Sequence, residues 1–272
     1  MTPTRKDFGV APYPWRDVLI TGATSGLGRA LAEACAAPGV TLHLSGRDAG
    51  RLDAVATACI ARGAAVSPAV LSVTDAEAMA RWIAGAGRLD LVIANAGISG
   101  GTGGTTEPAD QIQRIFATNV TGVLNTALPA IALMAEQPEG QGGVRGRIAV
   151  IASLAAFVAA PGAPAYCASK SAVQRWAEAT DATERQRGIR LHAVCPGYIR
   201  TPMTARNPFP MPFLMDPARA AQRTLDGIAA GKVRVAYPRR LYAMSRVVGA
   251  LPVGWRNALL SSVPAKGKER ST

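Results

Sequence analysis

A short apolar segment, a glycine-rich turn and an apolar helical pattern follow one another near the start of this chain. Residues 15–20 predict a buried strand, TGATSGLG occupies 21–28, and RALAEACAA predicts a helix directly after it. Glycines let backbone approach a pyrophosphate, and a helix N-terminus offers it free N–H groups and a positive dipole. This order predicts the first unit of a dinucleotide-binding α/β fold, although Gly22, Gly26 and Gly28 depart from the usual G-x-G-x-x-G spacing.

A tyrosine and a lysine four residues apart, Tyr166 and Lys170, are the second informative feature, since this arginine-rich chain has few lysines. Residues four apart share one face of a helix, and a helical pattern runs from Pro164 to Gly188. An ammonium group beside a phenol lowers its pKa from ~10, which would let Tyr166 exchange protons near neutral pH. The alternative is a surface cation beside a half-buried aromatic ring.

Several further motifs appear in a fixed order along the chain. They are Asn95-Ala96-Gly97 after LDLVIA, Asn119 in FATNVTGV, Ser153 in IAVIASLAA, and Pro196-Gly197 followed by Thr201. Together with TGATSGLG and the Tyr166–Lys170 pair, they make the chain resemble the compact single-domain branch of the short-chain dehydrogenase/reductase family, from about residue 16 to 201. The resemblance implies a Rossmann-type, doubly wound parallel sheet with helices on both faces, and hydride transfer between a nicotinamide and a carbonyl or alcohol.

Four catalytic residues are implied by this resemblance: Asn119, Ser153, Tyr166 and Lys170. Ser153 would hydrogen-bond the substrate oxygen, and Tyr166 would donate a proton to it or remove one. Lys170 would hold the nicotinamide ribose and lower the pKa of Tyr166, and Asn119 would hold a water of a proton relay. The alternatives are a strand-end cap for Ser153 and a helix-kink residue for Asn119.

The expected cofactor is NADP(H), with NAD(H) as the alternative. Gly46 and Arg47 stand where NAD-dependent relatives usually have an acidic residue, and a guanidinium pairs well with a 2′-phosphate. NAD(H) stays open because Asp48 is adjacent and Ser25 replaces a basic residue of many NADP-dependent relatives. Ser72 replaces an aspartate that contacts adenine in relatives. The expected cofactor contacts are Gly22, Thr24, Ser25, Gly26, Leu27, Arg47, Ser72, Val73, Asn95, Ala96, Gly97, Tyr166, Lys170, Pro196, Gly197, Ile199 and Thr201.

The chain is expected to form a single α/β domain with two extensions. Residues 1–14 are an N-terminal extension, 15–238 are the dinucleotide-binding and catalytic domain, and 239–272 are a basic amphipathic helical extension. A substrate lid is expected at about 199–217, beside the glycine-rich segment 99–108. Its apolar residues predict an apolar carbonyl or secondary alcohol as substrate, or else a structural role: Met203, Phe209, Met211, Phe213, Leu214 and Met215.

The net charge of +12 is concentrated near the C-terminus, where residues 232–272 hold nine basic side chains and one acidic. Leu241, Met244, Val248 and Leu251 repeat there at helical spacing. Such a helix either contacts an anionic membrane surface, through residues 239–263, or packs on its own domain or a partner subunit. No recognition motif accompanies the charge, so no nucleic acid partner is expected. The resemblance implies a homodimer or homotetramer.

Metal binding is not expected, because His43 and His192 fall in apolar strand patterns and the cysteines lack metal-type spacing. The uninterrupted apolar stretches are shorter than the ~20 residues that span a bilayer, and the N-terminus has no signal-peptide core, so a cytoplasmic location is expected. The alternative to an enzyme is a non-catalytic regulatory or scaffold protein that keeps the dinucleotide fold. The presence of all four catalytic residues favours the enzyme.

Overall fold

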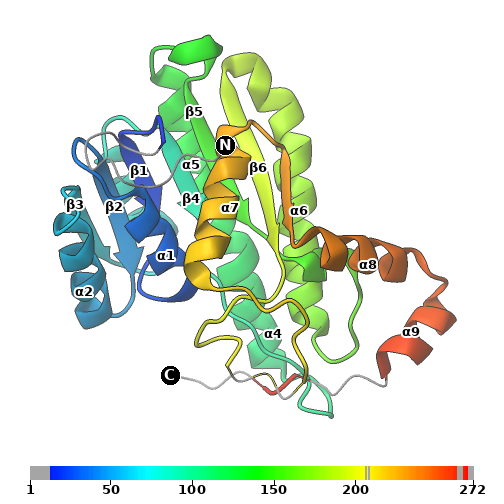
Figure 1. The fold of residues 1–272 in the computed structure, drawn as a ribbon. Coiled ribbons are helices and arrows are strands. Elements are labelled where there is room, and N and C mark those ends of the chain that lie inside the picture. The colour runs from blue at the N-terminus through cyan, green and yellow to red at the C-terminus, as the bar shows by residue number, and fades with distance from the viewer. Residues whose placement is uncertain (1–12, 206, 208, 262–265, 269–272) are drawn as a thin grey trace, which may run out of the picture.

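The fold is one parallel sheet between two layers of helices. The computed structural model describes residues 13–205, 207, 209–261 and 266–268 (Figure 1). In these residues seven strands pair in the order β3-β2-β1-β4-β5-β6-β7. The strands are β1 (Asp17–Ile20), β2 (Thr41–Gly46), β3 (Ala65–Val70), β4 (Leu91–Ala94), β5 (Gly146–Ile151), β6 (Ile189–Pro196) and β7 (Arg234–Tyr237). The central strands read as continuous apolar runs because both faces of a parallel sheet are buried.

The strands alternate with helices along the chain. The helices are α1 (Gly26–Cys35), α2 (Ala49–Ile60), α3 (Ala76–Ala84), α4 (Ala109–Phe116), α5 (Gly122–Glu136), α6 (Pro164–Glu184), α7 (Pro217–Ala229), α8 (Arg239–Ala250) and α9 (Val253–Ser261). A π-helical turn, Ala117–Thr121, joins α4 to α5. Short 3₁₀ turns occupy Gln141–Gly143, Leu154–Phe157 and Arg185–Arg187.

Two hydrophobic cores lie on opposite faces of the sheet. Leu31, Leu52 and Leu225 place α1, α2 and α7 on one face, where α1 and α7 lie side by side (Figure 1). Ile83 and Val173 belong to the other core, with α3, α5 and α6. Strand β1 pairs with β2 on one side and β4 on the other, so the two halves of the sheet grow outward from it. This arrangement confirms the doubly wound Rossmann-type fold expected from the sequence.

Local sequence signals mark where several helices begin and end. Pro164 and Pro217 are the first residues of α6 and α7, where a missing N–H is harmless. Asp48 and Asp75 precede α2 and α3, and each carboxylate accepts a hydrogen bond from the N–H three residues later. Gly188, at φ 74°, ends the turn after α6, as the helical pattern predicted.

One helix among the described residues is long and apolar enough to cross a membrane, by length and composition alone. It is the continuous stretch Ala109–Glu136, which includes α4, the π-helical turn and α5. This length exceeds the sequence expectation, which considered only uninterrupted apolar runs. In this fold α5 packs against α3, β4 and β5, so its apolar side chains serve the core of the domain.

Helices α8 and α9 project from the domain as an arm (Figure 1). Leu241 packs against the core, whereas the side chains of Met244 and Trp255 are 54% and 73% exposed. The Arg246 guanidinium turns inward and lies 5.8 Å from the ring centroid of Phe157. The expected basic extension is therefore helical here, with one face on its own domain and another exposed.

Parts of both expected extensions fall outside the described residues. These parts are 1–12 at the N-terminus, and 262–265 and 269–272 at the C-terminus. The proposed membrane segment 239–263 is thus described up to residue 261.

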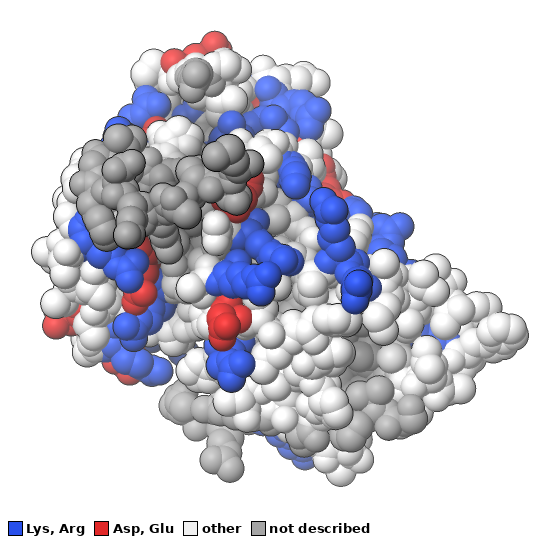
Figure 2. Space-filling view, in the orientation of Figure 1, with Lys and Arg blue, Asp and Glu red and all other residues white. Residues whose placement is uncertain are grey.

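The basic charge is spread over the surface rather than gathered in one patch on the face shown in Figure 2. Lys and Arg side chains are scattered there among Asp and Glu, and the arm is mostly uncharged in this view. Surface ion pairs such as Arg29–Glu33 use some of the arginines. Each exposed pair stabilises the fold by about 0–1 kcal/mol.

Burial of His192 should make the protein acid-sensitive. Its ring is fully buried in β6, Nδ1 lies 2.7 Å from the Lys232 carbonyl oxygen, and burial lowers its pKa to about 4. Below about pH 6.5 the unfolded chain therefore binds a proton that the native imidazole does not, and stability falls until about pH 4, by about 3 kcal/mol in total. Urea unfolding should show a clearly smaller loss between about pH 6.5 and pH 4 in His192→Asn than in the wild type.

The amide of Asn at position 192 can still donate to the Lys232 carbonyl, so the variant separates titration from the lost hydrogen bond. His43→Asn is the comparison, because burial lowers the pKa of His43 as well but His43 is less buried, so this variant should keep most of the acid sensitivity. Equal acid sensitivity of the wild type and His192→Asn would contradict the assignment.

Candidate active site

The turn between β1 and α1 is pressed against the end of β4. A Cβ atom on Gly22 would lie 2.8 Å from the Ala96 Cα, and one on Gly28 would lie 2.2 Å from the Gly22 carbonyl oxygen. The backbone at Gly22 has φ 64°, in the left-handed region that favours glycine. Ser25 precedes α1 without a side-chain cap, which leaves the first N–H groups of the helix for an anion.

Polar side chains at the strand ends hold this turn in place. The Thr21 hydroxyl accepts hydrogen bonds from the N–H groups of Asn95 and Ala96, at 3.1 and 3.2 Å. The Asn95 side-chain amide donates to the carbonyl oxygens of Thr21 and Gly22, both at 3.0 Å. The NAG motif therefore fastens the carboxyl end of β4 to the glycine turn.

A groove of about 330 Å³ follows the carboxyl ends of the strands from this turn. All of the expected cofactor residues line it: Gly22, Thr24, Ser25, Gly26, Leu27, Arg47, Ser72, Val73, Asn95, Ala96, Gly97, Tyr166, Lys170, Pro196, Gly197, Ile199 and Thr201. Residues that the sequence reasoning missed also line it, among them Arg51, Thr118, Ile151 and Ala152. Glycine backbone that leaves no space for a Cβ, beside a free helix N-terminus, fits the pyrophosphate of a dinucleotide.

Two arginines stand at the end of the groove near β2. Arg47 follows Gly46, the last residue of the strand, and Arg51 lies one turn into α2. Asp48, the acidic neighbour, caps α2: its carboxylate accepts from the Arg51 N–H at 2.9 Å and from Arg51 Nε at 2.7 Å. Asp48 does not line the groove. Asp48 stands three residues before Arg51, and this spacing is the sequence signal that could have identified Asp48 as the helix cap and Arg51 as a residue of the groove.

Ser72 was expected to contact adenine. Its hydroxyl group lies 2.8 Å from the Thr74 hydroxyl and accepts from the Thr74 N–H at 3.3 Å. Ser72 thus shapes the turn after β3 while lining the groove.

The other end of the groove holds Ser153, Tyr166 and Lys170. Ser153 follows β5 and its hydroxyl accepts from the Ala155 N–H at 3.1 Å, so it also serves as the strand-end cap considered above. Tyr166 and Lys170 lie one turn apart on α6, with Nζ of the lysine 6.0 Å from the tyrosine ring centroid. The ammonium donates to the carbonyl oxygen of Ile151 at 2.8 Å.

Burial dominates the protonation of this pair. It raises the pKa of Tyr166 to about 12, against the opposing effect of a hydrogen bond with Ser153. It also lowers the pKa of Lys170 to about 8. The expected lowering of the tyrosine pKa by Lys170 is not found here: burial raises the pKa of the phenol, and the effect that opposes burial comes from Ser153.

Asn119 lies in the π-helical turn between α4 and α5 and is fully buried. Its Oδ1 accepts from the Ile98 N–H at 2.9 Å, and its Nδ2 donates to the Ile98 carbonyl at 3.0 Å and to Ser169 Oγ at 3.1 Å. A Cβ on Gly97 would lie 3.2 Å from Asn119 Oδ1 and 3.4 Å from Lys170 Nζ, so Gly97 lets the two side chains converge. The π-helical turn therefore contains the expected catalytic residue Asn119, and such turns are frequent at functional sites.

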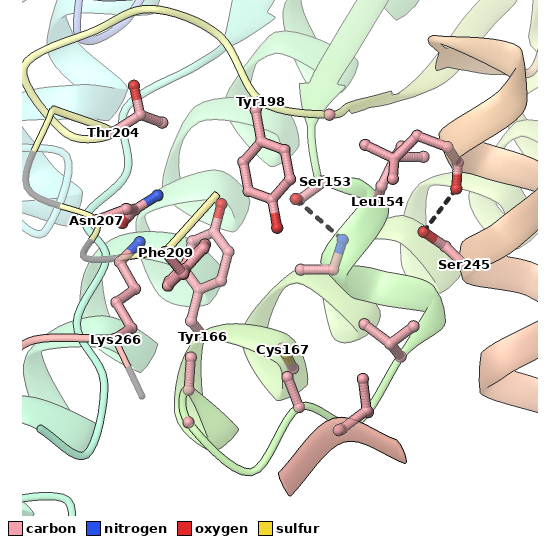
Figure 3. A pocket seen from close by; sticks show the side chains of 18 of the residues that line it. Ser153, Leu154, Tyr166, Cys167, Tyr198, Thr204, Asn207, Phe209, Ser245 and Lys266 are labelled. Atoms are coloured by element: carbon pink, nitrogen blue, oxygen red, sulfur yellow. Dashed lines mark hydrogen bonds between the residues drawn. The ribbon is translucent and has the colours of Figure 1, made fainter. Parts of the chain in front are cut away.

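A second cavity, of about 280 Å³, adjoins the groove (Figure 3). Ser153 and Tyr166 line both cavities, with Gly197, Met203 and Thr204. The rest of the second cavity is mostly apolar. A molecule in it would have its reacting oxygen at the two hydroxyl groups and face a nicotinamide in the groove.

Only part of the expected lid covers this second cavity. Met203 and Phe209 line it, and the Phe209 ring packs edge-on against Tyr198 with centroids 6.2 Å apart. The other four expected lid residues do not line it: Met211, Phe213, Leu214 and Met215. Phe213 is exposed, and Met215 is buried in the core because its pairing with Ile199 turns the segment back into the fold.

The remaining wall of the second cavity comes from segments that sequence reasoning did not assign to the site. Leu241 and Ser245 come from α8, Leu260 comes from α9, and Lys266 lies beyond them. The glycine-rich segment 99–108, expected to border the pocket, does not line it and instead hydrogen-bonds residues 266 and 267. No cluster of metal-ligating side chains occurs among the described residues.

A dinucleotide-shaped groove that ends at a tyrosine and a lysine defines the class of NAD(P)-dependent oxidoreductases. The family model for short chain dehydrogenases matches residues 16–209. An uncharacterized oxidoreductase of Myxococcus xanthus is 37% identical over 89% of this chain and 95% of its own length. Gluconate 5-dehydrogenase of Gluconobacter oxydans is 32% identical over 69% of this chain and 73% of its own length.

Solved structures agree with this class. The short-chain dehydrogenase from Sphingobium yanoikuyae in complex with NADPH has a TM-score of 0.75 and 27% identity, over 91% of this chain and 96% of that one. The chain belongs to the short-chain dehydrogenase/reductase family.

Gly28→Ala should damage both the fold and the groove. The added Cβ would meet the Gly22 carbonyl and the Asn95 amide, neither of which can move without opening the turn. We expect a loss of about 1–3 kcal/mol in the free energy of unfolding and at least about 10-fold weaker dinucleotide binding. Urea unfolding and fluorescence titration with NADPH and NADH measure the two effects.

Gly50→Ala is the control, because a Cβ there would meet only Asp48 Oδ1, at 3.8 Å. It should leave binding unchanged and stabilise the start of α2 by about 0.4–1 kcal/mol. Wild-type binding in Gly28→Ala would show that the turn does not hold the dinucleotide.

Proposed function

We propose that this chain is an NADP(H)-dependent oxidoreductase that acts on an apolar carbonyl compound or secondary alcohol, with Tyr166 as the acid/base. The observation that carries the proposal is that Ser153 and Tyr166 line both the dinucleotide groove and the adjoining cavity. A substrate oxygen placed there meets two hydroxyl groups at the boundary between the cavities. The apolar lining of the second cavity supports an apolar substrate.

The residues divide the chemistry in a simple way. The nicotinamide, when bound, supplies or receives the hydride at the substrate carbon. Tyr166 gives its phenolic proton to the carbonyl oxygen, and Ser153 donates a hydrogen bond to that oxygen as negative charge develops on it. Lys170 lines the groove beside the tyrosine, where it can hold the nicotinamide ribose, and the buried Asn119 would hold the water through which a proton returns.

The neutral phenol of Tyr166 is the form that takes part in carbonyl reduction. With a pKa raised to about 12, the Tyr166 phenol carries its proton at neutral pH. A proton donor is what carbonyl reduction requires of this residue, whereas alcohol oxidation requires the phenolate.

The basic end of the groove supports NADP(H) over NAD(H). Arg47 and Arg51 both line the groove, and the acidic side chain of Asp48 is engaged as a helix cap. Arginine pairs with a phosphate through two parallel hydrogen bonds, which a ribose hydroxyl cannot match. The NADPH complex of the Sphingobium yanoikuyae relative is consistent with this preference.

The whole proposal is tested by a screen of aliphatic, aromatic and acyl carbonyls, followed through NADPH and NADH oxidation in parallel. Tyr166→Phe should lower turnover of any substrate found by about 10²–10⁴-fold, since it removes the proton donor. It should bind NADPH as the wild type does. Tyr198→Phe, which removes another hydroxyl group from the same cavity, is the control and should keep most activity.

Full activity of Tyr166→Phe would show that another group donates the proton. A chain that binds the dinucleotide but reduces no carbonyl in the screen would instead support the non-catalytic alternative.

Arg47→Ala should weaken the binding of NADPH but not that of NADH. Loss of a charge-assisted contact to the 2′-phosphate is worth about 1.5–3 kcal/mol, so NADPH affinity should fall by about 10- to 100-fold while NADH affinity stays nearly constant. Titration of each cofactor measures the two affinities. Arg81→Ala, on the exposed surface of α3, is the control. Equal loss for both cofactors would contradict the assignment of Arg47 to the phosphate.

The homodimer or homotetramer, the membrane contact of 239–263 and the cytoplasmic location stay predictions from the sequence.

A further inference from the structure

The C-terminal residues 266–268 return to the domain and lie along the glycine-rich segment after β4. The Gly103 N–H donates to the Lys266 carbonyl at 2.9 Å, and the Gly101 N–H donates to the Gly267 carbonyl at 3.0 Å. A Cβ on Gly101 would lie 2.5 Å from the Lys266 carbonyl oxygen, so glycine at this position lets the two backbones meet. These contacts place Lys266 at the wall of the second cavity.

The Lys266 side chain extends into that cavity beside the proposed proton donor. Its Nζ lies 5.2 Å from the ring centroid of Tyr166 and 2.6 Å from the Ser99 hydroxyl, to which it donates. Figure 3 shows the Lys266 and Tyr166 side chains next to each other. Among the described residues that line the second cavity, Lys266 is the one with a positive charge.

This ammonium has no carboxylate partner within 4.0 Å among the described residues. The buried carboxylate of Glu107 lies in the neighbourhood, but its two oxygens accept from Gln111 Nε2 and the Ala165 N–H. Burial lowers the pKa of Lys266 to about 8, so the group is still mostly charged at neutral pH. Lys266 is half-buried at the cavity wall and has three donors, of which one goes to Ser99, so a bound anion can accept from the others.

The rest of the cavity would hold an apolar chain. Leu154, Val158, Phe209, Leu241 and Leu260 are among its lining residues. A ligand that satisfies the whole cavity therefore combines an apolar chain with one anionic group near the reacting carbonyl.

We propose that Lys266 is a specificity residue that binds a carboxylate of the substrate, so that the enzyme acts on oxo acids and their hydroxy acids. The carboxylate lies a few carbon atoms from the carbonyl group that Ser153 and Tyr166 hold, and the apolar chain fills the remaining cavity. This inference rests on the proposed oxidoreductase function of the same site. It narrows the substrate class from apolar carbonyl compounds in general to those with a carboxylate a few carbon atoms from the carbonyl group.

The test compares acids with their methyl esters, which have nearly the same shape without the charge. We would measure kcat and KM for 4-oxooctanoate, 5-oxooctanoate and both methyl esters with NADPH, for the wild type and Lys266→Met. The wild type should prefer at least one acid over its ester by about 10- to 100-fold in kcat/KM, the value of one charge-assisted hydrogen bond. Lys266→Met should lose that preference, mainly through KM, and keep its activity on the esters.

Lys268→Met is the matched control, because Lys268 lies in the same segment but does not line the cavity. It should behave as the wild type does. Retained ester reduction in Lys266→Met also shows that this variant is folded. An acid-to-ester ratio that is the same in the wild type and Lys266→Met would overturn the inference while leaving the oxidoreductase assignment intact.

A binding measurement separates failure of this inference from failure of the proposed function. Octanoate carries the carboxylate and the chain but no reducible carbonyl, and calorimetric titration into the NADPH-saturated protein measures its affinity directly. We expect about 10-fold weaker binding to Lys266→Met than to the wild type or Lys268→Met. Equal binding to all three overturns the role of Lys266, whether or not any carbonyl is reduced.

Discussion

The contact between the glycine turn and the end of β4 is the constraint on which the rest of the site depends. Gly28 faces the Gly22 carbonyl and the Asn95 amide, and Thr21 accepts from the backbone beyond β4. This contact fixes the carboxyl ends of β1 and β4 where the two halves of the sheet diverge. The helix N-terminus, the groove and the path of the chain toward Gly97 and Asn119 all follow from that junction.

Residue types at strand ends made the fold and the groove predictable from the sequence. A parallel sheet brings the carboxyl ends of its strands to one edge, so motifs after β1, β4, β5 and β6 had to meet. Arg51 was missed because its place in the groove depends on where α2 begins after Asp48. Lys266 was missed because no local pattern shows where a segment beyond the last helix returns, and Leu260 was missed because its place depends on how α9 folds over the cavity. The placement of Met215 depends on its pairing with Ile199.

Tyr166 has one lysine in each of the two cavities, Lys170 in the groove and Lys266 in the second cavity. Full burial of Lys170 and partial burial of Lys266 lower the pKa of each to about 8, because burial disfavours the charged form. The Ile151 carbonyl and the Ser99 hydroxyl satisfy one donor of each. Such groups are typical of sites in which function takes precedence over stability.

The two cavities draw their walls from different parts of the chain. The groove is made by strand ends and by the turns after them, whose positions are tied to the sheet. The second cavity shares Ser153 and Tyr166 with the groove but also takes Leu241, Ser245, Leu260 and Lys266 from the arm and the segment after it, outside the sheet. Changes in these outer residues can therefore alter which molecule is accepted without disturbing how the dinucleotide is held, so this protein has the means to diverge in substrate while its redox chemistry stays constant.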